Sequence, residues 1–147
     1  MLEELETLYR ARLPEFRRVA TAIAGDRELG CDAVQDAFAS AVRKRRSFRG
    51  QGTLEAWVWR IVVNAARDVR RRRPALAEPR EPSSNGHAPV LRLDLLTERQ
   101  REIVFLHYYA DLDYAAIAAA LAISPGTVGA TLNAARQTLR GALEEVH

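Results

Sequence analysis

The sequence has one cysteine, Cys31, one lysine, Lys44, and three histidines at scattered positions. A single cysteine cannot form a disulfide within the chain, and no Cys/His cluster has the spacing of zinc ligands. These absences exclude the disulfide-rich and zinc-finger classes, and we expect no bound metal and no cofactor. No pair of nucleophile and base and no phosphate-binding glycine loop stands out, so we do not expect an enzyme.

Segments that would direct the chain to a membrane are also scarce. The N-terminus is acidic, whereas a secretory signal needs a basic start. Residues 114–135 contain no charged side chain and are long enough to cross a bilayer. Because Pro125 and Gly126 interrupt this stretch at its middle, we expect a cytoplasmic protein with no membrane insertion.

Apolar and cationic residues are abundant. Hydrophobic residues make up 48% of the chain, which is enough for a packed core and too much for a disordered protein. The net charge of +3 conceals a strong asymmetry, because residues 43–73 carry 11 basic and 2 acidic side chains, or +9, whereas the segments before and after each carry −3. Such a cationic block indicates an anionic partner, most commonly a nucleic acid. The alternative is a solvated helix face.

The spacing of apolar residues predicts an all-α fold in two parts. Three amphipathic helices are expected over residues 2–24, 26–45 and 54–73, with Asp26 and Thr53 as start signals. Residues 74–91 hold four of the six prolines and no periodicity, which predicts a flexible linker. The domains expected are a three-helix domain over 1–73, the linker over 74–91, and a helix-turn-helix domain over 92–147.

The third expected helix carries a polar stripe between two apolar surfaces. The stripe consists of Arg60, Asn64, Arg67 and Arg71. At 100° per residue, Leu54, Trp57, Val58, Ile61 and Ala65 form the face that we expect in the core. Trp59 points away from that face and is the candidate for exposure, the alternative being that it packs in the core against the first two helices. Arginines beside an exposed ring suit a partner that has both phosphates and bases.

The C-terminal part shows the start signals of three further helices. Thr97 and Gln100 have capping-box spacing, Asp113 and Ser124 are further N-caps, and Pro125 suits a first helical turn. The helix after Thr97 is expected to bury Ile103, Val104, Leu106 and Tyr108. Ala122 stands in the turn of the helix-turn-helix, where glycine is usual.

In their order and spacing, these motifs resemble the extracytoplasmic-function (ECF) sigma factors of the sigma-70 family. The motifs similar to region 2 are Asp32-Ala-Val-Gln-Asp-Ala-Phe38, Phe48-Arg-Gly-Gln-Gly52, Ala56-Trp-Val-Trp-Arg-Ile61, Asn64 and the arginines 70–73. The motifs similar to region 4 are Leu96-Thr-Glu-Arg-Gln-Arg-Glu-Ile103, Tyr108-Tyr109, Asp113-Tyr-Ala-Ala-Ile-Ala118, Ile123-Ser124 and Gly126-Thr-Val128. The resemblance implies a factor that binds core RNA polymerase and directs transcription initiation at specific promoter DNA.

The resemblance also implies roles for individual residues. The polymerase-binding positions it implies are Asp32, Gln35, Asp36 and Phe38. The positions implied for the −10 promoter element are Phe48, Arg49, Trp59, Arg60, Asn64, Arg67 and Arg71. The family's usual arrangement adds an anti-sigma factor as a further partner.

Recognition of the −35 element is expected to be weak or atypical. The candidates for it are Ser124, Thr127, Thr131, Asn133, Arg136 and Gln137. Family members usually place four basic residues along this helix, where the chain has Gly129, Thr131, Asn133 and Ala134. Binding to duplex DNA depends on neutralising phosphates, so the loss of these cations weakens it.

Two alternatives remain open at this point. A degenerate sigma-like protein-interaction module would explain the uncharged face of the last helix, although the basic stripe argues against it. A helix-turn-helix transcription regulator that acts without core polymerase would have to bind duplex DNA through that same uncharged face.

Overall fold

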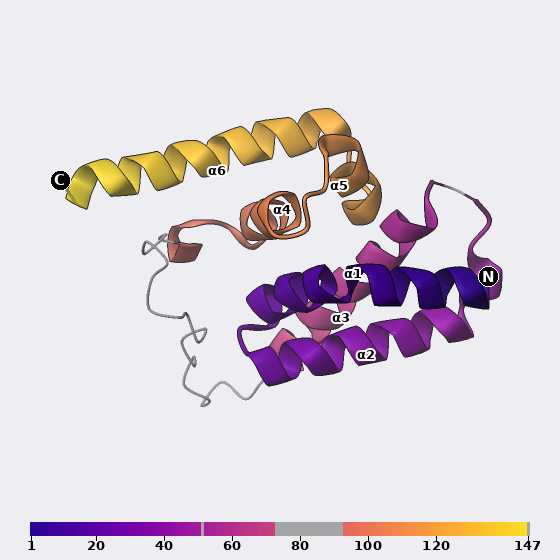
Figure 1. The fold of residues 1–147 in the computed structure, drawn as a ribbon. Helices are drawn as coiled ribbons and strands as arrows, with labels where there is room; N and C mark the ends of the chain where they lie inside the picture. The colour runs from indigo at the N-terminus through magenta and orange to yellow at the C-terminus, as the bar shows by residue number, and fades with distance from the viewer. Residues whose placement is uncertain (51, 73–92, 147) are drawn as a thin grey trace.

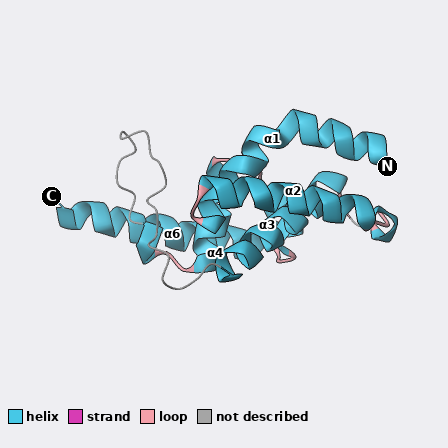
Figure 2. Cartoon of the chain, turned by 90° about the horizontal axis from the view of Figure 1, so that it is seen from below, coloured by secondary structure: helices cyan, strands magenta, loops and turns pink. Residues whose placement is uncertain are grey.

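The computed structural model describes residues 1–50, 52–72 and 93–146, and all regular structure in these ranges is helical (Figure 2). The α-helices are α1 (Leu2–Ala24), α2 (Arg27–Arg43), α3 (Leu54–Arg72), α4 (Glu98–Tyr108), α5 (Tyr114–Leu121) and α6 (Pro125–Val146). Two 3-10 turns, η1 (Arg45–Ser47) and η2 (Leu93–Leu95), precede α3 and α4. The all-α class is confirmed, and the linker expected over 74–91 lies outside the described residues.

The helices α2 to α6 begin after residues whose side chains predict a cap, whereas α1 follows Met1 without a side-chain cap. The N-cap side chains that accept a hydrogen bond from a first-turn N–H are Asp26, Thr53, Thr97, Asp113 and Ser124. The capping box at Thr97 is complete in both directions. Each such bond satisfies a backbone donor that the helix itself leaves without a partner, which is why these short polar residues set the helix starts.

The helices α1, α2 and α3 form a bundle, which we call the first module. Its centre is aromatic: the Phe16 ring lies 5.2 Å from that of Phe38 and 4.4 Å from that of Trp59, centroid to centroid. The crossing of α1 and α2 is close because Gly30 has no side chain. A Cβ atom there would lie 2.5 Å from Thr21 Oγ1, nearer than such atoms can approach.

The side of α3 that enters this core differs from the expected one. Trp59 is 0% exposed, so the prediction that it is the exposed tryptophan is wrong. The buried side chains of α3 are Ala56, Val58, Trp59, Val62, Val63 and Ala66. Trp57 is only half-buried. The helix is apolar on two sides, and Phe16 selects the side that carries Trp59.

The helices α4, α5 and α6 form the second module. Its core includes the predicted residues Ile103, Leu106, Ile117 and Leu132. Tyr108 was expected inside but is 51% exposed, and Phe105 takes the buried position instead. Phe105 is buried because α1, α5 and α6 contact α4 on more than one side. As a result, α4 is buried over the continuous run 102–106.

The turn between α5 and α6 is closed by a left-handed residue. Ala122 has φ of 58° and ψ of 46°, and its N–H donates to the carbonyl of Ala118. Glycine adopts this conformation without steric cost, whereas alanine does not. The prediction that Ala122 occupies the usual glycine position of the helix-turn-helix is confirmed.

The two modules pack against each other (Figure 1). The helix α5 lies against α3, and α4 lies against α1. Among the described residues, no single helix is both long and apolar enough to span a membrane. The uncharged stretch predicted from the sequence is instead divided between α5 and α6, which meet at an angle of 104°.

Candidate nucleic-acid interface

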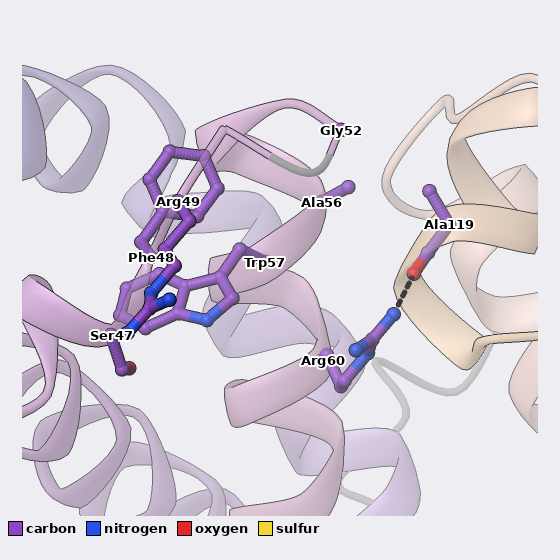
Figure 3. A pocket seen from close by; sticks show the side chains of 8 residues that line it. All are labelled: Ser47, Phe48, Arg49, Gly52, Ala56, Trp57, Arg60 and Ala119. Atoms are coloured by element: carbon purple, nitrogen blue, oxygen red, sulfur yellow. Dashed lines mark hydrogen bonds between the residues drawn. The ribbon is translucent and has the colours of Figure 1, made fainter.

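A pocket of about 370 Å³ lies beside the start of α3. Its lining residues are Ser47, Phe48, Arg49, Gly52, Ala56, Trp57, Arg60 and Ala119 (Figure 3). The rings of Phe48 and Trp57 form its apolar wall, with centroids 5.4 Å apart and planes inclined by 45°. Arg49 and Arg60 are both exposed at its edge. An aromatic wall flanked by guanidinium groups can hold an unstacked base while its phosphates are neutralised.

The polar stripe of α3 leads away from this pocket along the helix. Arg60, Asn64 and Arg71 are exposed, as expected for residues that contact a partner. Arg67 is half-buried, and its Nη1 donates to Asn64 Oδ1 over 3.3 Å. The structure therefore keeps the four predicted stripe residues on one side of α3, outside the core of the first module.

Two stripe arginines are already engaged by the second module. Arg67 donates through Nε to Glu102 Oε2 over 2.5 Å and through Nη2 to Glu102 Oε1. This bidentate bond raises the pKa of Arg67. Arg60 Nη2 donates to the carbonyl oxygen of Ala119 in α5 over 2.7 Å, as the dashed line in Figure 3 shows.

A third arginine joins the modules farther along the bundle. Arg12 of α1 donates through Nη2 to the carbonyl oxygen of Ala110 over 2.6 Å. Its Nε lies 3.0 Å from Glu55 Oε1 of α3. Arg12 therefore links the first turn of α3, through Glu55, to the segment that follows α4.

The polymerase-binding candidates lie on α2. Asp32, Gln35 and Asp36 are exposed and share one side of the helix. Phe38 is 8% exposed and packs on Phe16, so its side chain belongs to the core and is not available to a partner. The acidic side of α2 continues into a polar groove of about 360 Å³ that includes Asp36.

The −35 candidates follow the start of α6. Ser124, Thr127, Asn133 and Gln137 are exposed, whereas Thr131 is half-buried. Ser124 Oγ accepts from the Thr127 N–H over 3.1 Å and lies 2.8 Å from Thr127 Oγ1, so both hydroxyls are tied into the helix start.

Arg136, the one cationic candidate on α6, is held by a tyrosine. Its Nε donates to Tyr108 Oη over 3.0 Å, and this bond raises the pKa of Arg136. Gly129 stands where a longer side chain would meet the ring of Tyr114, because a Cβ atom there would lie 3.3 Å from Tyr114 Cε2. Tyrosines thus cover part of the face where family members usually place basic residues.

Three residues of this interface were not predicted from the sequence. Trp57 was assigned to the core, whereas it lines the pocket. Glu102 and Arg12 were not singled out at all. Glu102 directly precedes the apolar run Ile103–Leu106. A helix that is apolar all round is expected to be covered on several sides. This run was the one sequence signal that Glu102 would be buried.

A cationic face with an aromatic pocket, joined to a helix-turn-helix, defines a two-module DNA-binding transcription factor. The family profile "Sigma-70 region 2" matches residues 8–75, and "Sigma-70, region 4" matches residues 90–139. The chain belongs to the sigma-70 family, in its ECF branch. Sigma factors are non-catalytic regulators, and the chain binds core RNA polymerase and directs initiation at promoters. The two alternative readings are not favoured.

Curated relatives agree with this assignment. The ECF RNA polymerase sigma factor EcfG of Rhodopseudomonas palustris is 27% identical over 147 residues, covering 90% of this chain and 81% of that protein. The RNA polymerase sigma-E factor of Streptomyces antibioticus is 28% identical over 153 residues, covering 96% of this chain and 85% of that protein. SigM of Mycobacterium tuberculosis is 39% identical over 77 residues, or 52% of this chain and 38% of that protein.

Solved structures share the fold. CnrH, in complex with the cytosolic domain of CnrY, matches with a TM-score of 0.74 at 21% identity, covering 99% of this chain and 90% of that one. The sigma factor RpoE of Bartonella quintana, in complex with the anti-sigma factor NepR, matches with a TM-score of 0.72 at 23% identity, covering 97% and 98%.

Proposed function

We propose that this sigma factor holds the separated −10 strand with the pocket at the start of α3 and the arginine stripe beyond it. The observation that carries the proposal is the position of Phe48 and Trp57, whose rings form one wall between Arg49 and Arg60. The rings take an unstacked base, and the guanidinium groups take the adjoining phosphates. Asn64 and Arg71 extend the contact along the strand. Trp59 has no part in it because it is buried.

The acidic side of α2 is the proposed polymerase contact. Asp32, Gln35 and Asp36 present two carboxylates and an amide to solvent, which suits a basic surface on the partner. This proposal divides the chain at residues 73 and 92, with polymerase and −10 binding in the first module and −35 binding in the second. It also places the protein in the cytoplasm, where polymerase and promoter DNA are found.

Contact of the second module with the −35 element is proposed to be weak. The α6 face offers Ser124, Thr127, Asn133 and Gln137 as uncharged donors and acceptors, with Thr131 partly covered. Its only cationic candidate, Arg136, is bonded to Tyr108. Few phosphates are neutralised by such a face, so most of the promoter affinity comes from the first module.

An anti-sigma factor is proposed as a regulatory partner. Support comes from the similar RpoE of Bartonella quintana, whose structure was solved with the anti-sigma factor NepR. The fold similarity extends over 97% of this chain, so the surface available to such a partner is built from the same elements.

The test measures promoter opening at saturating core polymerase on a supercoiled template. Arg60→Ala combined with Arg67→Ala is expected to reduce open-complex formation at least tenfold, because two phosphate contacts of the stripe are lost. Arg17→Ala combined with Arg18→Ala removes the same charge from exposed positions on α1 and is the control. Equal open-complex formation by the two double variants, at equal affinity for core polymerase, would contradict the proposal that the arginine stripe of α3 binds the −10 strand.

A further inference from the structure

We propose that Tyr108 and Arg136 together bind one phosphodiester group of duplex DNA at the edge of α6. The site consists of the Tyr108 hydroxyl and the Arg136 guanidinium group, and we call it the phosphate clasp. The inference rests on the proposed function of the second module and deepens it. It adds a tyrosine to the DNA-binding residues and assigns Arg136 to the DNA backbone instead of to a base.

One hydrogen bond joins the two parts of the clasp. Arg136 Nε donates to Tyr108 Oη over 3.0 Å, and the guanidinium carbon lies 5.9 Å from the centre of the Tyr108 ring. The Tyr108 hydroxyl, followed by that of Tyr114, raises the pKa of Arg136. Tyr108 is 51% exposed and Arg136 is exposed as well. The bond therefore holds the guanidinium group at the surface, where a partner can reach it.

The hydrogen bond between Tyr108 and Arg136 leaves donors for an anion. A guanidinium group has five N–H bonds in one plane, and the bond to Tyr108 uses one of them. A phenol oxygen that accepts a hydrogen bond keeps its own proton to donate. Because this oxygen accepts from a cation, the Tyr108 O–H is polarised and becomes a stronger donor. Both groups are thus able to donate to oxygens of the same phosphate.

The phenol orients Arg136 without cancelling its charge. Arg67 provides the contrast, because its guanidinium group is bonded to the carboxylate of Glu102 and the pair has no net charge. The partner of Arg136 is a neutral hydroxyl, so the positive charge remains available to a phosphate. An arginine side chain that is already held in place also loses less conformational freedom when it binds.

Aromatic rings line the side of α6 on which Arg136 lies. Arg136 is seven residues after Gly129, so the two residues are on the same side of the helix. A Cβ atom at Gly129 would lie 3.3 Å from Tyr114 Cε2, so the ring of Tyr114 is close to α6 there. The ring of His107 connects the two tyrosines, with its centroid 4.8 Å from that of Tyr108 and 5.8 Å from that of Tyr114. This packing fixes the position of the clasp.

The position of the clasp suits the backbone of a duplex. Asn133 and Gln137 are exposed and lie about 60° and 100° around α6 from Arg136, in the same direction. When a helix lies in the major groove, its central side faces the base edges and its flanks face the phosphates. Arg136 and Tyr108 are on the flank when Asn133 and Gln137 face the bases. The clasp then sets the register of α6 on the duplex without reading the sequence.

The first experiment measures binding of the holoenzyme to two labelled duplexes without a −10 element, one with the −35 element and one with a scrambled sequence in its place. Tyr108→Phe is expected to weaken binding to both duplexes about tenfold, because a hydrogen bond to a charged group is lost. Tyr109→Phe removes a hydroxyl from the next residue, whose ring stacks on Phe105, and is expected to change binding less than twofold. Wild-type affinity of the Tyr108→Phe holoenzyme for both duplexes would overturn the proposal.

The second experiment measures the slope of log affinity against log salt concentration. Arg136→Gln removes a cation and is expected to make this slope shallower by about 1. Tyr108→Phe is expected to lower the affinity and leave the slope unchanged, because the phenol is neutral. Arg17→Gln removes the same charge from an exposed position on α1 and is the control. A slope for Arg136→Gln that equals that of the control would overturn the proposal.

A third measurement separates the clasp from a bond that only stabilises the fold. In an Arg136→Gln background, Tyr108→Phe is expected to weaken duplex binding less than threefold, because the two groups bind one phosphate as a unit. Chemical unfolding of the free chain is measured for the same variants. A Tyr108→Phe protein with a lower unfolding free energy and unchanged duplex affinity would show a structural bond only and would overturn the proposal.

The outcomes also separate this inference from the proposed function. If the wild-type holoenzyme binds the −35 and scrambled duplexes equally and Tyr108→Phe weakens both, the proposed −35 recognition fails while the clasp stands. If the wild-type holoenzyme prefers the −35 duplex and Tyr108→Phe binds both duplexes as wild type does, the clasp fails and the proposed function stands.

Discussion

Replacing Trp57 separates the role of the aromatic pocket from the role of the core. Trp57 and Trp59 are two positions apart on α3, about 200° around the helix. Trp57 is half-buried and lines the pocket, whereas Trp59 is 0% exposed and packs on Phe16. One chain thus offers two tryptophans with different expected effects, and each serves as the control for the other.

The magnitudes follow from these environments. Loss of base stacking on a ring costs about 1–3 kcal/mol, so Trp57→Ala is expected to weaken binding of a −10 strand to the holoenzyme by roughly 5- to 150-fold. Half-burial of the ring limits the loss of fold stability to about 1–2 kcal/mol. Trp59→Ala removes a fully buried ring and is expected to cost about 3–5 kcal/mol of unfolding free energy.

The assay combines fluorescence anisotropy of a labelled −10 strand on the holoenzyme with chemical unfolding of the free chain. Trp59→Phe keeps most of the core volume and is expected to bind the strand within about twofold of wild type. Strand affinity of the Trp57→Ala holoenzyme within twofold of wild type would refute the stacking argument. A larger effect of Trp59→Phe than of Trp57→Ala on strand affinity would refute the assignment of the two rings.

Two further predictions concern the second module. Ala122→Gly is expected to raise the unfolding free energy by about 0.5–1 kcal/mol. Glycine removes the steric cost of a φ of 58° and loses part of that gain to the greater entropy of the unfolded chain. A melting temperature no higher than that of wild type would contradict this prediction. Ala134→Arg adds a cation to the exposed face of α6. It is expected to steepen the slope of log affinity against log salt concentration for −35 duplex binding by about 1, whereas the control Ala39→Arg on α2 should leave this slope unchanged. Equal slopes for the two variants would show that this face of α6 does not contact the duplex.

Local signals were sufficient for the helices of the described part. Caps such as Thr97, Asp113 and Ser124 act through hydrogen bonds to residues two or three positions away, so the sequence alone contains both partners. The same holds for Ala122, whose place between two helices demands a left-handed residue whatever surrounds it.

The orientation of α3 could not be derived in this way. Both sides of the helix carry apolar side chains, and the choice between Trp57 and Trp59 is made by Phe16 of another helix. A buried indole N–H usually has a hydrogen-bond partner. For this reason, a tryptophan next to arginines was expected to be exposed. Trp59 departs from this rule, since no hydrogen-bond acceptor for its Nε1 is found in the described ranges.

The contacts between the modules were beyond sequence analysis for a different reason. The Arg67–Glu102 and Arg12–Ala110 pairs join residues 35 and 98 positions apart, and no local pattern specifies such partners. The charge asymmetry did locate the arginines. It did not show that an acidic residue of the same chain accepts from one of them.

The position of α4 has a consequence for the lifetime of the protein outside the transcription complex. This helix is buried from Glu102 to Leu106 because α1 covers it on one side and α5 and α6 cover it on others. Loss of the contact with α1 would expose apolar side chains of α4 to water, and exposed apolar surface promotes self-association and degradation. The contact between α1 and α4 therefore protects the chain as well as positioning its second module.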